Sequence, residues 1–247
     1  MEGLTGIIMA AGRGVRLGEL THDKPKPLVQ VAGVELIRFG LAFLQDLGVE
    51  KKIVVTGYGA EALSDVVRRY DPTCVLIHND AFHKGSATTL ERALAEVNGP
   101  FVVMTADHIF RKDIAERARL QFGESLTIFT DRDRTLGDDD MKVSLDPEDG
   151  RVLKLSKTLE EYDCGYVGFS YCPESITHLV KETISEAKDV FGPSANLEHV
   201  WQTLADIGHR IETADISGSK WLEVDFPEEL IKATEEVENN KEKYHHL

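Results

Sequence analysis

Hydrophobic and polar residues alternate in blocks along the first half of the chain. Short apolar runs, typical of strands buried on both faces, alternate with segments whose apolar residues recur at helical spacing. The pattern predicts strands at residues 6–12, 51–59, 73–80 and 100–110, and helices at 34–48, 60–70, 86–97 and 112–122, with Ser86 as an N-cap. This order predicts an α/β fold with a Rossmann-like, mixed but mainly parallel sheet and helices on both faces.

The second half of the chain has a different pattern. A predicted strand at 125–134 leads into the acidic run 136–140, and residues 142–156 indicate a hairpin that turns at Asp149 and Gly150. Further strands are predicted at 164–172 and 209–225, and helices at 174–187, 197–208 and 227–244, the last of them exposed. We therefore expect an inserted hairpin and a small helical cap added to the sheet.

The domain organisation expected from this pattern is simple. Residues 1–235 are predicted to form a single domain, because no internal repeat or low-complexity linker interrupts them. Residues 236–247 are predicted to be the end of the last helix and a tail, whose final residues from 241 onward are frayed.

Charge and composition narrow the class of protein. The formal net charge of -15 argues against a broad nucleic-acid or membrane surface. No apolar run reaches the roughly 20 residues of a membrane helix, and the start of the chain lacks the features of a signal peptide. The three cysteines form no CxxC pair, which suits a reducing compartment. We expect a cytoplasmic protein with no nucleic-acid partner and no membrane segment.

One loop gathers positive charge and flexible backbone in this acidic chain. The stretch "MAAGRGVRLGELTHDKPKPL", residues 9–28, contains three glycines, two arginines and two lysines. Glycines let backbone amides approach an anion closely. The dinucleotide fingerprint does not fit, because Leu17 stands at its third glycine position, and no GK[ST] of a Walker loop follows. The loop is either a phosphate cradle of another design or a solvated surface loop.

The two halves of this loop carry a resemblance to a known family. "GRGVRL" at 12–17 and "PKPL" at 25–28 resemble the signature of the sugar nucleotidyltransferases, also called nucleoside-diphosphate-sugar pyrophosphorylases. Val15 departs from the usual Thr or Ser. The resemblance implies a nucleotidyltransferase fold, similar to the GT-A fold, and a nucleoside triphosphate as substrate.

The resemblance also implies roles for individual residues. Arg16 and Lys26 would be the catalytic cations on the triphosphate, which suits a forked guanidinium and a compact ammonium. Asp107 and Asp225 would hold Mg²⁺, which prefers carboxylate and phosphate oxygens. Lys157 would contact the acceptor phosphate. The nucleotide would be bound by two segments, comprising Ala10, Ala11, Gly12, Arg13 and Gly14, and Gly85, Ser86 and Ala87.

Within the family the chain is most similar to the CTP:inositol-1-phosphate cytidylyltransferases, in stretches such as "MTADHIF" and "WLEVDF". Ala106 replaces the usual glycine before the first metal aspartate. Asp131 and Arg132, in "TDRDR", are candidate contacts for a polyol phosphate or, equally, a charged turn. The resemblance implies transfer of a cytidylyl group from CTP to inositol-1-phosphate, and a functional link to a separate membrane CDP-alcohol phosphotransferase that consumes CDP-inositol.

Three other functions stay open from the sequence. The first is a cytidylyltransferase that uses phosphocholine, an aminophosphonate or another phosphorylated acceptor. The second is a sugar-1-phosphate nucleotidyltransferase, because base selection by backbone groups leaves no mark in a sequence. The third is a nucleotide-binding sensor without catalytic activity, which the joint presence of both cations and both aspartates disfavours.

Overall fold

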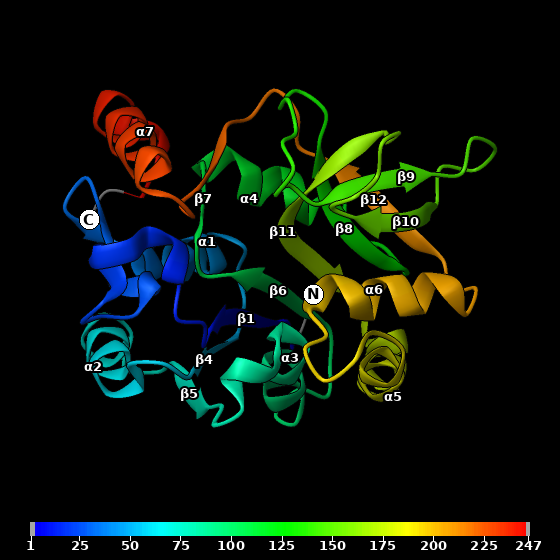
Figure 1. Cartoon of the computed structure of the whole chain (residues 1–247), viewed down its shortest axis with the longest axis horizontal. Helices are drawn as coiled ribbons and strands as arrows, with labels where there is room; N and C mark the ends of the chain where they lie inside the picture. Colours follow the sequence, from blue (N-terminus) through cyan, green and yellow to red (C-terminus); the bar gives the residue numbers. More distant parts are fainter. Residues whose placement is uncertain (1–2, 246–247) are drawn as a thin grey trace.

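A nine-stranded mixed sheet runs through the centre of the computed structural model, which describes residues 3–245 (Figure 1). Its strands are β1 (Thr5–Ala10), β4 (Lys51–Thr56), β5 (Val75–His78), β6 (Phe101–Thr105), β8 (Leu126–Asp131), β9 (Lys142–Leu145), β10 (Val152–Ser156), β11 (Cys164–Cys172) and β12 (Ile211–Asp215). Two short ribbons accompany it, formed by β2 (Gln30–Val31) with β3 (Val34–Glu35) and by β7 (His108–Phe110) with β13 (Trp221–Glu223).

The sheet has a parallel block and an added antiparallel part. Strands β5, β4, β1 and β6 are parallel neighbours in that order. Strand β11 lies antiparallel to β6 and extends the sheet toward β8 and toward the β9–β10 hairpin. Gly150 adopts a φ of 73° in that hairpin's turn, as predicted. The sequence-based prediction of an α/β fold with an inserted hairpin is therefore confirmed.

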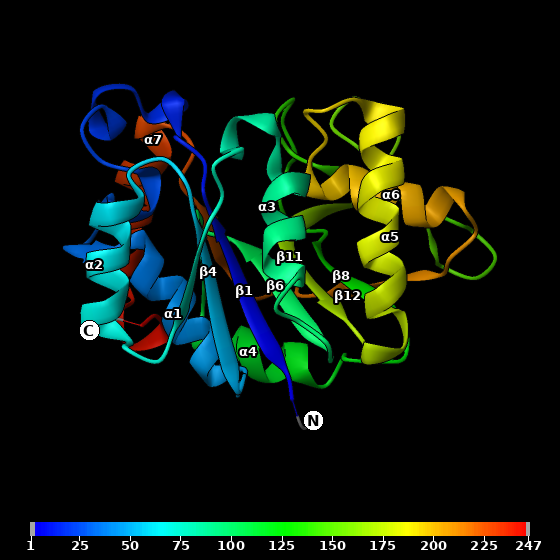
Figure 2. The same cartoon turned by 90° about the horizontal axis from the view of Figure 1, so that it is seen from below.

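Helices cover both faces of the sheet, as the sequence predicts. They are α1 (Leu36–Asp46), α2 (Ala60–Tyr70), α3 (Ser86–Leu94), α4 (Lys112–Arg119), α5 (Glu174–Phe191), α6 (Leu197–Asp206) and α7 (Pro227–Asn239). Figure 2 shows α3 and α5 in front of the sheet. Ile7 and Met9 of β1 pack on that face with residues of α3, α5 and α6, whereas Ile8 and Ala10 pack on the other face with residues of α1 and α4. No helix within residues 3–245 is long and apolar enough to span a bilayer.

Two of the predicted strands are each divided in the structure. The run 100–110 forms β6 and then β7, separated by a turn at Ala106 and Asp107, and the run 209–225 forms β12 and then β13. The second pieces leave the main sheet and pair with each other antiparallel, so that His108 lies opposite Glu223. This ribbon matters for the site, because Asp107 directly precedes β7 and Asp225 follows β13.

The C-terminal segment is more ordered than predicted. Helix α7 ends at Asn239 instead of residue 244, and its Ala233 and Val237 pack in a third apolar cluster with Tyr244. The Tyr244 ring is fully buried, and its hydroxyl donates to Glu236 Oε1 at 3.1 Å. The prediction of a frayed end is therefore wrong up to this residue, because the buried ring ties down the segment, whereas α7 is exposed or half-buried everywhere except at Ala233 and Val237. Residues 246–247 lie outside the described residues.

Candidate active site

A cleft opens at the carboxyl ends of β1 and β6, where ligands bind in open α/β sheets. It consists of three cavities of about 270, 150 and 940 Å³. Arg16 and Asp107 line all three, so the cavities are parts of one continuous site. The smallest lies in the middle, between the loop after β1 and the wall formed by β10 and α6.

Lys26 occupies the centre of the site. It lies in a short 3₁₀ turn between Pro25 and Pro27, and its ammonium donates hydrogen bonds to Asp107 Oδ2 at 2.6 Å and to Asp225 Oδ1. Burial alone would lower the pKa of Lys26, but the two carboxylates outweigh it and hold the pKa above its usual value. The Lys26 side chain is therefore positively charged and held in place by the two carboxylates. The structure brings together three predicted site residues that are far apart in sequence.

Arg16 and Lys157 both contact Asp139 of the acidic run 136–140. One Arg16 nitrogen is 2.7 Å from Asp225 Oδ2, and the other is 3.7 Å from Asp139 Oδ2. The Lys157 ammonium is 4.0 Å from Asp139 Oδ1. Asp139 thus bridges one cation predicted for the triphosphate and one predicted for the acceptor. Both cations line the central cavity together with Asp107.

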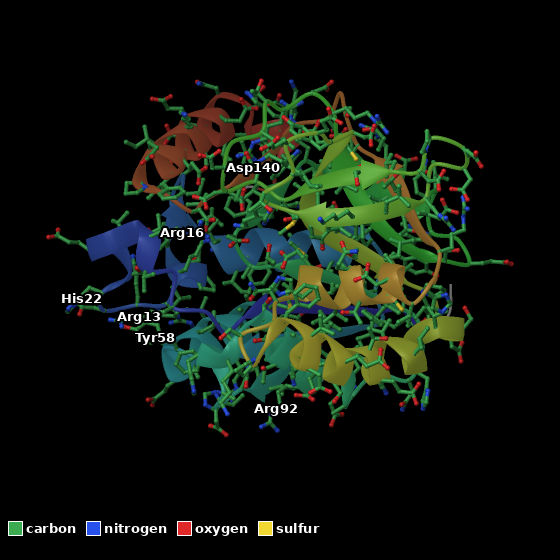
Figure 3. All side chains as sticks on the ribbon, turned by 45° about the vertical axis from the view of Figure 1, so that its right-hand side comes forward. Arg13, Arg16, His22, Tyr58, Arg92 and Asp140 are labelled. Carbon is green, nitrogen blue, oxygen red and sulfur yellow. The ribbon has the colours of Figure 1, made fainter. Side chains whose placement is uncertain are left out.

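The glycine loop places its backbone against the stem of Lys26. Ala10, Gly12 and Gly14 line the 270 Å³ cavity with Arg16, as expected for a phosphate cradle. Ala11 is buried, and its carbonyl accepts the N–H of Tyr58 at 3.0 Å. The structure does not bring the Arg13 side chain to the cleft, because its guanidinium lies 5.2 Å from the Tyr58 ring centre. Figure 3 shows Arg13 and Tyr58 at the edge of the molecule, outside the position of Arg16.

Gly14 is the position in this loop that a side chain would disrupt most. Its φ is +69°, and a Cβ there would lie 2.5 Å from Lys26 Cβ. We expect Gly14→Ala to lower turnover by up to about 10²-fold, because it displaces Lys26. Unfolding free energy should fall by about 1–2 kcal/mol for the backbone and by about 1–3 kcal/mol more for the clash.

Gly150→Ala is the matched control for that variant. Gly150 has a φ of +73°, but a Cβ there meets nothing within 4 Å, so only the backbone cost applies. Kinetics and urea unfolding of both variants check the prediction. Equal losses of stability with unchanged turnover in Gly14→Ala would show that the contact with Lys26 is irrelevant.

The segment Gly85–Ala87 lies at the start of α3. Gly85, with a φ of 86°, is the N-cap of α3, and Ser86 is already helical. The Ser86 N–H donates to Asn196 Oδ1 at 3.1 Å, and the Ala87 N–H donates to the Ala195 carbonyl at 3.1 Å. These two amides therefore join α3 to the start of α6. Ser86 still lines the 940 Å³ cavity, whereas the Ala87 side chain is fully buried.

Asp131 and Arg132, the candidate acceptor contacts, are not brought to the cleft. The Asp131 carboxylate is buried and accepts the Trp221 indole N–H at 2.6 Å and the Asp133 amide at 2.7 Å. The Arg132 guanidinium points toward Asp215, at 3.7 Å. Asp131 lines a separate cavity of about 560 Å³ beside α7. The "TDRDR" stretch is thus a charged turn whose aspartate anchors β13.

Sequence reasoning missed two parts of the site. The first is the wall formed by the N-terminal half of α6, where Glu198 and His199 line the 940 Å³ cavity. No motif marks this helix, and only its position opposite Lys157 shows it. The second is His108, whose Nδ1 lies 2.8 Å from Asp107 Oδ1. Its position next to Asp107, the aspartate predicted to bind Mg²⁺, was the available signal.

The two carboxylates suit a divalent cation. Asp107 and Asp225 face a single positive centre, the Lys26 ammonium, with one oxygen each. Within residues 3–245 no group of three or more His, Cys, Asp or Glu side chains is placed to hold a metal ion. A cation here would take two protein oxygens and complete its shell with phosphate oxygens and water, which is how Mg²⁺ binds at nucleotide sites. The residues present fit that ion.

The fold and the cleft define a protein of the nucleotidyltransferase class. A family model described as the MobA-like NTP transferase domain matches residues 6–148, and the chain belongs to that family. The "Bifunctional IPC transferase and DIPP synthase" of Aquifex aeolicus is 30% identical over 93% of this chain and 50% of its own length. The chain thus spans about half the length of this relative.

Solved structures share the fold. An inositol-1-phosphate CTP transferase from T. maritima superimposes with a TM-score of 0.79 and 21% identity, over 95% of this chain and 96% of that one. A CTP:phosphocholine cytidylyltransferase from Streptococcus pneumoniae gives a TM-score of 0.72 and 22% identity, over 95% and 99%. The resemblance drawn from the glycine loop is confirmed at the level of family and fold.

Proposed function

We propose that this chain transfers the cytidylyl group of CTP to inositol-1-phosphate and releases pyrophosphate, with Mg²⁺ bound by Asp107 and Asp225. The observation that carries the proposal is the contact of Lys26 with both carboxylates at the carboxyl edge of the sheet. Arg16 and Lys157 both line the adjoining 150 Å³ cavity, and each lies within 4.0 Å of Asp139. Three cations thus surround the position at which two phosphates would meet.

The reaction needs no general base in this site. A phosphate oxygen of inositol-1-phosphate forms a new bond to the α-phosphorus of CTP, and the bond to the bridging oxygen of the β-phosphate breaks. The second pKa of a phosphate monoester is about 6, so the attacking oxygen is already ionised at neutral pH. Pyrophosphate leaves with the electron pair of the broken bond. Catalysis then consists of positioning and charge stabilisation.

The residues divide these tasks by their place in the cleft. Arg16, with a forked guanidinium on the glycine loop, would bind triphosphate oxygens, and Lys26 would stabilise the charge that develops around the α-phosphorus. Lys157, on the far side of Asp139, would hold the acceptor phosphate. Bound Mg²⁺ would neutralise phosphate oxygens and orient them.

The 940 Å³ cavity supports a polyhydroxylated acceptor. Ser156, Asn196 and Glu198 line it, with Lys157 at its inner end. The Glu198 carboxylate has no hydrogen bond or ion pair with any other described residue, and it borders both the central cavity and this one. A free carboxylate next to the acceptor phosphate site suits sugar or cyclitol hydroxyls.

A choline head group fits this cavity less well. Quaternary ammonium groups are bound by several aromatic faces, and Phe191 is the one Phe, Tyr or Trp ring among the described lining residues. Its ring stacks on His199 at 4.3 Å between centroids. Trp201 is fully buried in the core. The named activities of the Aquifex aeolicus relative and of the T. maritima structure also favour inositol-1-phosphate.

Pyrophosphate release tests the proposal. Purified protein is incubated with Mg²⁺, one of CTP, UTP, ATP, GTP or dTTP, and one of inositol-1-phosphate, phosphocholine or a hexose-1-phosphate. CTP with inositol-1-phosphate should give the highest kcat/KM. A preference for UTP or dTTP with a hexose-1-phosphate would contradict the proposed substrates, but the chain would still be a nucleotidyltransferase. Tight nucleotide binding without pyrophosphate from any pair would indicate a sensor.

A link to a membrane CDP-alcohol phosphotransferase is part of the same proposal, because CDP-inositol needs a consuming enzyme.

A further inference from the structure

His108 lies directly behind the first proposed metal carboxylate. It is the first residue of β7, and its side chain is 6% exposed. Its Nδ1 is 2.8 Å from Asp107 Oδ1 and 2.7 Å from Thr105 Oγ1. An ionised carboxylate can only accept, so the Nδ1 N–H donates to Asp107. The Nε2 atom, 3.9 Å from Glu223 Oε1, is too distant for a hydrogen bond.

The two oxygens of Asp107 have different partners. Oδ1 accepts from His108, whereas Oδ2 accepts from Lys26 at 2.6 Å and faces the cleft. A carboxylate that is held through one oxygen cannot rotate freely to present the other. The contact with His108 therefore fixes the direction of the oxygen that a cation in the cleft would use.

The imidazole ring is itself held in one orientation. The Trp221 ring stacks on it at 5.4 Å and 13°, and the Phe110 ring lies at 6.0 Å and 21°. On the side of β11, Gly168 has a φ of +68°, and a Cβ there would lie 2.7 Å from His108 Cε1. The Arg134 guanidinium lies 4.6 Å from the Trp221 ring centre. Aromatic rings and a glycine thus form a slot that matches an imidazole.

We propose that His108 is a positioning residue, which orients the Asp107 carboxylate for the metal ion through its Nδ1 N–H. This inference rests on the proposed Mg²⁺ site at Asp107 and Asp225. Groups that hydrogen-bond to metal ligands from behind fix the direction of the ligand, and their loss commonly lowers metal affinity or activity by about 10- to 100-fold. His108 also lines the 150 Å³ cavity, but the role inferred here is to orient Asp107 and not to bind a substrate.

Two amide variants separate positioning from packing. The shorter side chain of His108→Asn carries an N–H donor near the position of Nδ1, whereas the longer side chain of His108→Gln places its amide near Nε2. Thermal unfolding is measured at increasing Mg²⁺ concentrations with CTP present. The acceptor is left out, so that no turnover occurs. The quantity compared is the Mg²⁺ concentration that gives half of the maximal rise in Tm. His108→Gln should need about 10- to 100-fold more Mg²⁺, and His108→Asn should recover most of the wild-type affinity.

Further measurements complete the test. CTP binding in EDTA should be unchanged in both variants, and the exposed His178→Gln is the matched control. Equal Mg²⁺ requirements of the two His108 variants would overturn the inference, because packing would then explain the defect. If His108→Gln does not fold, His108→Asn decides alone, and a Mg²⁺ requirement about 10-fold or more above wild type in it would also overturn the inference, because its N–H donor remains near Asp107 Oδ1. A wild-type protein that shows no Mg²⁺-dependent stabilisation would instead refute the metal site itself.

Discussion

Replacing Lys26 by methionine is expected to lower kcat by about 10²- to 10³-fold, the loss typical of removing one charge-stabilising group from a transition state. Methionine keeps most of the side-chain volume that Gly14 packs against, so the change removes charge more than shape. KM for CTP should rise much less than kcat falls, because Arg16 remains to bind the triphosphate. Steady-state kinetics at saturating Mg²⁺ checks both numbers.

The same variant should show a stability defect that depends on metal. Without Lys26, the carboxylates of Asp107 and Asp225 face each other with no ammonium between them, and they keep only the contacts of Asp107 with His108 and of Asp225 with Arg16. We expect a loss of about 3 kcal/mol in EDTA, as for a buried ion pair that loses one partner, and a smaller loss with Mg²⁺. Lys24→Met, two residues earlier and exposed, is the control. Wild-type kcat in Lys26→Met would remove Lys26 from the mechanism.

Asp107→Asn and Asp225→Asn should each lower Mg²⁺-dependent turnover by about 10³-fold, equivalent to about 4 kcal/mol of transition-state stabilisation. An asparagine keeps the shape of the side chain but offers the ion a neutral oxygen. CTP binding in EDTA should not weaken in either variant, because each removes a negative charge next to Lys26.

The readout for these two variants is kcat as a function of Mg²⁺ concentration. Asp138→Asn, an exposed aspartate of the acidic run 136–140, is the matched control and should behave as wild type. If either Asp107→Asn or Asp225→Asn keeps the wild-type dependence on Mg²⁺, that residue does not bind the ion.

The sequence was informative where physical constraints act locally. Strands buried on both faces need continuous apolar residues, so β1, β4 and β6 could be found, and the periodicity of α2 matched its bounds of Ala60–Tyr70. Asp107 could be placed at the carboxyl edge of the parallel strands, where ligands bind in such sheets, whereas the place of Asp225 followed from the family resemblance. Lys26 and Asp225 are 199 residues apart in sequence, yet they contact each other there.

Features that depend on pairing between distant segments could not be predicted. Within the run 209–225, Ser217 and Gly218 mark a turn locally, but nothing local shows that β13 then leaves β12 to pair with β7. Asp131 has the appearance of an exposed binding residue, and only the fold brings the Trp221 indole to its carboxylate. The burial of Tyr244 follows from the position of α7 over the loop after β1. In each of these cases the structural role of the segment or residue depends on a contact with a segment that is distant in sequence.

The most direct measurement of the central claim is the identity of the product when all substrates compete. The protein is given equal concentrations of CTP, UTP, ATP, GTP and dTTP with inositol-1-phosphate, phosphocholine and a hexose-1-phosphate, in Mg²⁺, and the products are separated and weighed by mass spectrometry. CDP-inositol should be the dominant product, and it should disappear in EDTA. Discrimination against UTP should follow from a buried group left unpaired by the wrong base, at a cost of about 1–3 kcal/mol. A dominant nucleoside-diphosphate hexose, or CDP-inositol formed equally well in EDTA, would contradict the account.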